Sequence, residues 1–318
     1  MNKRTVLLAS PRGFCAGVDR AIEIVETALK VYGTPLYVKH EIVHNKHVVQ
    51  NFIEKGVIFV EEISAIPNHS TVIFSAHGVS PQVWQEAKER HLNIIDATCP
   101  LVTKVHLEAK RYAKEGKHIL LIGHKNHVET QGTYGEAPDK ITIIETVEDV
   151  KRLHFPEDMP LAYLTQTTLS VEDTKEIIDA LKEKYPHIEG PKKNDICYAT
   201  TNRQLAVHEI SERADLVLVL GSANSSNSNR LKELASKKGI PAYLIDSAKE
   251  IQSEWITDSV QVIGVTAGAS APESLVQEVL DELANRYHAT EIKEEITVTE
   301  DVSFQMPKNL REAMHAAS

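Results

Sequence analysis

Three cysteines are the residues of this 318-residue chain whose type and spacing first suggest chemistry: Cys15, Cys99 and Cys197. Each follows a short apolar segment and precedes a helical pattern, and a thiol at the start of a helix has a lowered pKa, which favours the thiolate. An odd, small number of cysteines does not indicate a disulfide framework. A free cysteine is more often a small apolar residue of a core, so the surroundings of the three must decide between the two interpretations.

Widely separated thiolates indicate a metal centre if the fold brings them together. Their spacing is not that of a zinc finger, whose paired cysteines stand about two to four residues apart. The tight cysteine runs of ferredoxins are also absent. We therefore favour an iron–sulfur cluster that is held by three protein thiolates and leaves one iron open to a substrate. A zinc ion with three thiolates and a water is the weaker alternative.

Histidines stand in three loops that follow expected strands: His40 and His44 in "HEIVHN", His77 in "SAHG", and His124 and His127 in "GHKNHVE". A single histidine is usually structural, but imidazolium donors at several strand ends suit phosphate oxygens. Three further loops, "TQTTLS", "GSANSSNSN" and "TAGASAP", carry hydroxyls and amides, which can cradle an anion at a helix start. The chain has no GxGxxG or GxxxxGK[ST] motif, so no motif indicates a nucleotide.

Glu129 is the one acidic residue that we single out among these loops. An isolated loop glutamate is usually only a solvated carboxylate, but inside a metal-bearing cavity it becomes the natural proton donor. Asp19, Asp96 and Asp195 flank the cysteines, and we interpret them as capping or structural residues.

The segments around the cysteines repeat along the chain. A short apolar segment that predicts a strand precedes each cysteine, most weakly in "NDIC", and helical patterns follow over residues 16–33, 100–116 and 198–214. In the third helix we expect Leu205, Val207 and Ile210 to face inward. The next strand begins 21, 20 and 19 residues after the three cysteines, and such near-constant spacing indicates an internal structural repeat.

This alternation of strands and helices predicts an α/β fold with parallel sheets and helical crossovers. We expect three similar α/β units in a pseudo-threefold trefoil around a central cluster. Their expected boundaries are 14–98, 99–196 and 197–318, and the N-terminal strand 1–13 completes the third unit. Ligands bind at the carboxyl ends of parallel strands, so the cysteines and the polar loops would face one cavity.

Composition narrows the classes of partner. The formal charge of −10 argues against a nucleic acid or a membrane surface, although a local pocket can still bind an anionic small molecule. The N-terminus has too short an apolar run for a signal peptide, and no run approaches the ~18 apolar residues of a membrane helix. We therefore expect a cytoplasmic protein.

Eight segments together resemble the 4-hydroxy-3-methylbut-2-enyl diphosphate reductase family, from Arg12 to about Pro272: "RGFCAGVDRAI", "HEIVHN", "FSAHGVS", "DATCPLVTKVH", "TQTTLS", "DICYATTNRQ", "NSSNSNRL" and "GVTAGASAP". The motifs are long and jointly specific. The tail after about Glu291 resembles the family more weakly, at "PKNLR".

The resemblance implies a trefoil around a [4Fe-4S] cluster with Cys15, Cys99 and Cys197 as its ligands. The implied reaction is a two-electron reductive dehydroxylation that gives isopentenyl and dimethylallyl diphosphate, with ferredoxin or flavodoxin as the electron donor. Glu129 would deliver a proton, helped by Thr167 or Thr168, and His127 is the remaining candidate catalytic residue. The implied diphosphate-binding residues are His44, His77, His127, Thr168, Ser225, Ser226, Asn227 and Ser270.

One departure from the family and two alternatives remain. The family usually has proline where this chain has Val128, and proline restricts the backbone, so this loop is expected to be freer here. The first alternative is a redox-neutral iron–sulfur hydro-lyase, which would need arginines for carboxylates, and the polar loops supply few. The second is a non-enzymatic iron–sulfur sensor, which would not need so many anion-binding side chains.

Overall fold

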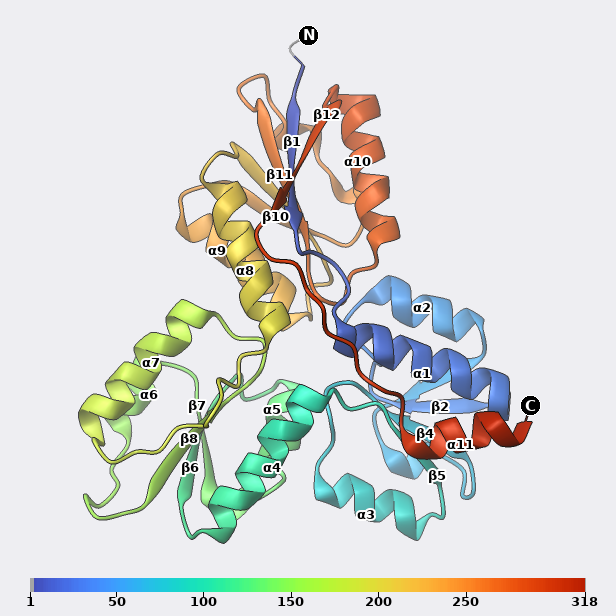
Figure 1. Cartoon of the computed structure of the whole chain (residues 1–318), viewed down its shortest axis with the longest axis vertical. Helices are drawn as coiled ribbons and strands as arrows, with labels where there is room; N and C mark the ends of the chain where they lie inside the picture. The colour runs from blue at the N-terminus through green and yellow to red at the C-terminus, as the bar shows by residue number, and fades with distance from the viewer. Residues whose placement is uncertain (1–2, 318) are drawn as a thin grey trace. The chain divides into compact units, whose positions relative to one another are not determined.

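Strands alternate with helices along the chain, and the described strands pair in parallel to form three sheets (Figure 1). A computed structural model describes residues 3–317. The chain divides into two compact units. Unit 1 comprises Met1–Val18, His44–Gln50 and Tyr198–Val302, and unit 2 comprises Asp19–Val43, Asn51–Cys197 and Ser303–Ser318.

Unit 1 contains a five-stranded sheet in the order β10-β9-β11-β1-β12. Its strands are β1 (Thr5–Ser10), β9 (Leu216–Leu220), β10 (Ala242–Ile245), β11 (Val262–Ala267) and β12 (Glu291–Ile296). Its helices include α8 (Tyr198–Ser211), α9 (Ser226–Lys237) and α10 (Glu273–Tyr287). Strand β1 pairs with β11 on one side and β12 on the other, so an early segment of the sequence lies between two late strands.

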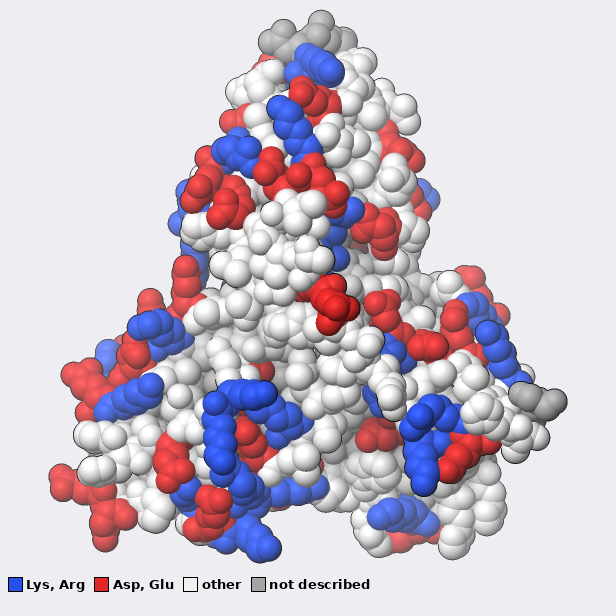
Figure 2. All heavy atoms as spheres, viewed as in Figure 1, with Lys and Arg blue, Asp and Glu red and all other residues white. Residues whose placement is uncertain are grey.

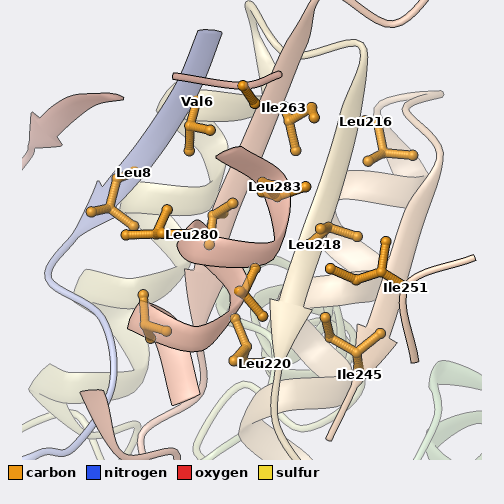
Figure 3. Close-up of a cluster of buried hydrophobic side chains, with 14 of the residues drawn as sticks. Val6, Leu8, Leu216, Leu218, Leu220, Ile245, Ile251, Ile263, Leu280 and Leu283 are labelled. Carbon is orange, nitrogen blue, oxygen red and sulfur yellow. The ribbon is translucent and has the colours of Figure 1, made fainter. Parts of the chain in front are cut away.

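Both faces of this sheet are covered, which explains the continuous apolar run "LVLVL" of β9. On one face, Val6, Leu8 and the even-numbered leucines of β9 pack with Leu280 and Leu283 of α10 (Figure 3). On the other face, Val217 and Val219 of the same strand pack with Val207 and Ile210 of α8. The alternation of side chains along each strand thus supplies two separate hydrophobic clusters.

Unit 2 contains the other two sheets, in the orders β3-β2-β4-β5 and β7-β6-β8. The strands are β2 (Leu36–Lys39), β3 (Val57–Val60), β4 (Thr71–Phe74), β5 (Asn93–Asp96), β6 (His118–Ile122), β7 (Ile141–Ile144) and β8 (Leu161–Thr165). The remaining α-helices are α1 (Ala16–Tyr32), α2 (Lys46–Glu54), α3 (Pro81–Glu89), α4 (Pro100–Lys114), α5 (Val128–Tyr134), α6 (Val147–Arg152), α7 (Val171–Lys184) and α11 (Lys308–Ala317).

The prediction of parallel α/β sheets is confirmed, and the three helices that follow the cysteines are α1, α4 and α8. The sequence analysis did not predict β3, β7 and β10, four-residue strands that each pair with the strand after a cysteine-bearing helix. The strand predicted before Cys197 is wrong, because residues 194–197 are irregular. There the carboxylate of Asp195 accepts the N–H of Thr165 at 3.0 Å and occupies the place of a strand carbonyl.

The expectation that Leu205 faces inward is also wrong, since this side chain is 50% exposed while Val207 and Ile210 are buried. The buried stripe of α8 instead contains small and polar residues, among them Thr200, Arg203 and Gln204. An apolar pattern therefore cannot locate this face, and the buried Arg203 is explained below by what it binds.

Among residues 3–317, no helix has the length and apolar composition that crossing a membrane requires. Figure 2 shows Lys and Arg side chains gathered over α4 with Asp and Glu side chains among them, so the basic residues there do not form an unbroken patch.

Gly264, in the middle of β11, allows the close approach of α8 to the sheet. A Cβ at this position would lie 3.1 Å from Val217, 3.2 Å from Ile210 and 3.3 Å from Ala214. We expect Gly264→Val to lower the free energy of unfolding by about 1–3 kcal/mol through overpacking, and Gly264→Ala to lower it less. Denaturant unfolding of the two variants and the wild-type protein measures the order, and a valine variant as stable as the wild type would contradict it.

Candidate active site

Each cysteine donates its backbone N–H to a loop that begins where a parallel strand ends. The N–H of Cys99 is 2.9 Å from the carbonyl oxygen of Ala76, after β4. In the same way, Cys197 donates to Thr167 at 3.0 Å, after β8, and Cys15 donates to Ala269 at 3.3 Å, after β11. The cysteines and the predicted substrate-binding loops are therefore connected through the backbone, within unit 2 for Cys99 and Cys197 and within unit 1 for Cys15.

The cysteines occupy helix starts, as the sequence predicts. Cys99 is the N-cap of α4, and Cys15 and Cys197 directly precede α1 and α8. Burial raises the pKa of the Cys15 thiol, while hydrogen bonds from the backbone N–H groups of Val18 and Gly17 and the charge of Arg203 act in the opposite direction. No disulfide joins the three, all of which lie in the described part of the chain.

This donor set fits a soft metal group. A buried thiol with N–H donors at its sulfur is stabilised as a thiolate when a metal binds, because the metal bond offsets the cost of burying the charge. Thiolates select zinc or iron–sulfur clusters over hard cations. A thiol in the surroundings of Cys15 thus suits zinc or an iron–sulfur cluster as its partner.

Glu129 lies in the first turn of α5, whose N-cap is His127. The Nδ1 atom of His127 accepts the N–H of Glu129 at 3.2 Å, which fixes the start of the helix. Val128 is the first residue of α5, a position that proline also suits, so the helix begins here with valine in place of the family's usual proline.

The carboxyl group of Glu129 is almost completely buried, with the residue 3% exposed. Its Oε1 accepts the N–H of Thr167 at 2.6 Å and its Oε2 accepts the hydroxyl of Thr167 at 3.0 Å. Burial raises the pKa of Glu129 to about 7, and the charge of Asp195 acts in the same direction, while the two bonds from Thr167 oppose the shift. A carboxyl group with such a pKa can hold and release a proton near neutral pH.

Thr167 and Thr168 have different partners. Thr167 contacts Glu129, whereas the hydroxyl of Thr168 accepts the amide N–H of Gln166 at 2.9 Å. The Oε1 atom of Gln166 accepts the N–H of His124 at 3.0 Å and the hydroxyl of Thr130 at 3.2 Å. Gln166 therefore connects the loop after β8 to the loop and helix after β6.

Two predicted histidines of unit 2 lie near each other. The rings of His77 and His127 meet edge to face with their centroids 6.2 Å apart, and Nδ1 of His77 is 3.2 Å from the hydroxyl of Ser75. The ring of His40 also meets that of His77 edge to face, with the centroids 5.7 Å apart, and its Nδ1 lies 2.9 Å from Glu61. His124 faces a carboxylate, with Nδ1 3.2 Å from Glu145. Unit 2 thus brings together His77 and His127, and through the cap of α5 also Glu129 and Thr167.

Unit 1 brings the other predicted anion-binding residues together at the start of α9. Ser225 is the N-cap of α9, and Ser226 and Asn227 are its first residues. The side-chain oxygen of Asn227 accepts the N–H of Ala269 at 3.0 Å. The hydroxyl of Ser270 donates to the backbone oxygen of His44 at 2.8 Å, so the loops after β2, β9 and β11 meet here.

Three residues of these loops were missed as site residues. Gln166 stands inside the quoted motif "TQTTLS" and would have been found by asking what holds the two threonines. Asn224 has its side-chain nitrogen 3.4 Å from Nδ1 of His44. The hydroxyl of Tyr198, directly after Cys197, accepts the N–H of Ala16 at 3.2 Å. Asp96 and Asp195 are structural, as predicted, since their carboxylates accept backbone N–H groups of Thr98 and Thr165.

Parallel sheets whose strand-end loops carry thiols, imidazoles, hydroxyls and one buried carboxyl group define the ligand site of an α/β enzyme. The family model described as "LytB protein" matches residues 6–284. A protein of Haemophilus influenzae (strain PittEE) named 4-hydroxy-3-methylbut-2-enyl diphosphate reductase is 56% identical over 309 residues, which are 96% of this chain and 98% of that protein. The chain therefore belongs to the LytB family.

Other comparisons agree with this assignment. A protein of the same name from Ruthia magnifica is 56% identical over 306 residues, 96% of this chain and 99% of that protein. The solved structure of the E-1-hydroxy-2-methyl-but-2-enyl-4-diphosphate reductase from Plasmodium falciparum superimposes with a TM-score of 0.97 at 42% identity, covering 99% of both chains. The resemblance inferred from the sequence motifs is confirmed.

The burial of Glu129 makes stability depend on pH. The unfolded chain loses the proton of this group near its usual pKa of 4.5, whereas the folded protein keeps it until about 7. The buried Glu129 side chain therefore makes its full contribution to the free energy of unfolding below about pH 4.5. This contribution is lost as the pH rises through about 7. The comparison uses the cofactor-free proteins. We expect the unfolding free energy of Glu129→Gln minus that of the wild type to increase by on the order of 3 kcal/mol between about pH 5 and about pH 8.

The matched control is Glu176→Gln, a change at an exposed glutamate on α7. Its unfolding free energy relative to wild type should stay constant over the same pH range, because no burial cost is removed. A Glu129→Gln difference that also stays flat would show that the folded protein does not retain the proton of Glu129.

Proposed function

We propose that this chain reduces (E)-4-hydroxy-3-methylbut-2-enyl diphosphate to isopentenyl diphosphate and dimethylallyl diphosphate. Membership of the LytB family makes the chain an oxidoreductase, and its relatives carry the name of this reductase over nearly their full length. The single structural observation that supports the chemistry best is the buried Glu129 carboxyl group, which is bonded twice to Thr167 and has a pKa of about 7.

The reaction replaces an allylic hydroxyl by hydrogen. It consumes two electrons and two protons and releases one water: one proton leaves with the hydroxyl oxygen, and the other forms the new C–H bond at either end of the allyl system. A [4Fe-4S] cluster held by Cys15, Cys99 and Cys197 would pass the two electrons, one at a time, from the external electron donor to the substrate, and would offer an open iron for the substrate hydroxyl. The fit of the three thiols to a soft metal group supports this cofactor.

Glu129 is the proposed donor of the proton that leaves with the oxygen. In its protonated form the group retains the proton close to neutral pH, which suits a general acid. The hydroxyl of Thr167 holds one carboxyl oxygen in place. His127 caps the same helix turn, and Thr168 completes the proposed catalytic set on the loop after β8.

The diphosphate is proposed to bind to neutral hydroxyls and amides together with imidazoles, although the protein has a net charge of −10. The start of α9 offers the N–H groups of a helix N-terminus and the side chains of Ser225, Ser226 and Asn227, which suit phosphate oxygens. The further proposed ligands are His44, His77, His127, Thr168 and Ser270.

Three further points belong to the same proposal. The three α/β units are proposed to span 14–98, 99–196 and 197–318 with 1–13, the boundaries given by the repeat. Ferredoxin or flavodoxin is the proposed electron donor. The cytoplasm is the proposed compartment, because three cysteines without a disulfide suit a reducing environment.

An anaerobic assay tests the reaction. Protein reconstituted with iron and sulfide, a reduced viologen dye and the allylic diphosphate should give both five-carbon diphosphates. Glu129→Gln should keep the iron and sulfide content but lose roughly 10²–10⁴-fold in turnover, while Glu176→Gln stays active. Serine at any of the three cysteines should abolish the visible absorbance of the cluster. Absence of product with the wild-type protein would overturn the proposal, and turnover without any reductant would favour the hydro-lyase.

The pH dependence of turnover tests the role of Thr167. Thr167→Val removes the hydroxyl that donates to Glu129 and opposes the upward pKa shift. We expect the alkaline limb of the kcat/KM profile to move to higher pH in Thr167→Val, because the general acid then keeps its proton longer. Thr167→Ser, which retains the hydroxyl, should keep the wild-type limb. If the alkaline limb of the valine variant stays in place or moves to lower pH, the hydroxyl of Thr167 does not control the pKa of the proton donor.

A further inference from the structure

Each helix that follows a cysteine carries one buried or half-buried cation near its start: Arg20 in α1, Lys104 in α4 and Arg203 in α8. These residues stand five, five and six positions after Cys15, Cys99 and Cys197. The sequence analysis assigned none of the three a role. Their contacts follow one pattern, in which the cation of each helix holds the loop before the next cysteine.

Arg20 of α1 holds the loop before Cys99. Its guanidinium donates to the backbone oxygens of Ala97 at 3.2 Å and Thr98 at 3.0 Å, and more weakly to that of Asp96 at 3.4 Å. The residue is 9% exposed. These carbonyl groups lie in the turn between β5 and α4, and the arginine fork can bind several of them at once.

Lys104 of α4 holds the loop before Cys197. Its ammonium donates to the backbone oxygens of Lys193 at 2.6 Å and Asn194 at 3.3 Å and to the carboxylate of Asp195 at 2.8 Å. This is the segment in which the sequence wrongly predicts a strand. A lysine side chain therefore helps to order a loop that is itself not part of a strand.

Arg203 of α8 holds the loop before Cys15, so each of the three cysteine loops is bound by a cation from another cysteine's helix. Its guanidinium donates to the backbone oxygen of Gly13 at 3.0 and 2.8 Å and to that of Phe14 at 3.1 Å. The residue is 0% exposed, and Glu300 accepts from its Nη1 at 3.0 Å. The charge of Arg203 also acts to lower the pKa of the Cys15 thiol against the larger effect of burial.

We propose that Arg20, Lys104 and Arg203 are positioning residues that hold each metal-binding cysteine loop from the helix of the preceding cysteine. The inference rests on the proposed function, because it takes the three cysteines as the ligands of one iron–sulfur cluster. Each cation fixes the backbone of a cysteine loop, and the charges of Arg20 and Arg203 also act on the thiols of Cys99 and Cys15. Partners of metal ligands act in this way on affinity and on reduction potential.

The C-terminal segment supplies further acceptors for two of these cations. Glu300 binds Arg203 in unit 1, and the backbone oxygen of Gln305 accepts Nε of Arg20 at 2.7 Å in unit 2. The tail that resembles the family only weakly thus contacts two of the three positioning residues.

Arg4 provides a matched control within unit 1. It is also a buried arginine, 9% exposed, that donates to three backbone oxygens, those of Val260, Tyr287 and Thr257. It stands before β1, whereas Cys15 follows the other end of that strand. Replacing Arg4 removes the same kind of bonds without changing a cysteine loop.

The experiment compares reconstituted holoprotein variants by iron release to a chelator and by the midpoint potential of the bound cluster. Arg203→Met, Arg20→Met and Lys104→Met should release iron roughly tenfold faster than wild type or more. Their midpoint potentials should shift to more negative values, because reduction adds negative charge next to a missing cation. Lys104→Arg should restore both properties, and Arg203→Lys should restore the potential more fully than the release rate.

Arg4→Met should leave the release rate and the potential of the cluster at wild-type values, even if its thermal stability falls. Circular dichroism of the apoproteins identifies any variant that does not fold. If an arginine variant does not fold, the test rests on Lys104→Met, because the Lys104 side chain is 28% exposed and its loss disturbs the fold less. If folded Lys104→Met retains wild-type release and potential, or behaves as Arg4→Met does, the inference is wrong. If the wild-type protein takes up no iron and sulfide at all, the proposed function fails together with it.

Discussion

A backbone hydrogen bond from each cysteine to the loop at the end of a parallel strand is the constraint on which the rest of the structure depends. The acceptors lie in the loops after β4, β8 and β11, and the same loops carry His77, Thr167 and Ser270. A thiol therefore cannot move without moving residues proposed to hold the substrate. The parallel sheets make this possible, because they place the ends of their strands at a common edge.

Burial is what gives Glu129 its chemistry, and the same burial makes the group unfavourable for stability once it ionises. The N–H and hydroxyl groups of Thr167 offset part of this cost by donating to the carboxyl group. A fully solvated glutamate would be more stable at neutral pH but would have lost its proton long before. The site thus exchanges folding stability for a carboxyl group that stays protonated, a common relation at catalytic positions.

The sequence was sufficient to predict the parallel α/β sheets, the helices after the cysteines and the polar loops. These features can be recognised in short segments, from the period of the apolar residues or from runs of small polar residues. The four-residue strands β3, β7 and β10 could not, since so few residues carry no clear period. The burial of Arg203 could not be predicted either, because its partners at residues 13–14 are distant in sequence. For the same reason the motif around Glu129 indicated a proton donor, but not how deeply the carboxyl group is buried.

The pairing of β1 with β11 and β12 has a consequence for how the protein is made. Strand β1 is synthesised before its partners at residues 262–296, so the sheet of unit 1 stays incomplete while the intervening residues are made, on the order of tens of seconds. Until then Cys15 also lacks its acceptor at Ala269. The nascent chain thus exposes the thiol of Cys15 before the other two cysteines are made, and the loop of Cys15 gains its backbone partner only after residue 269 has been synthesised.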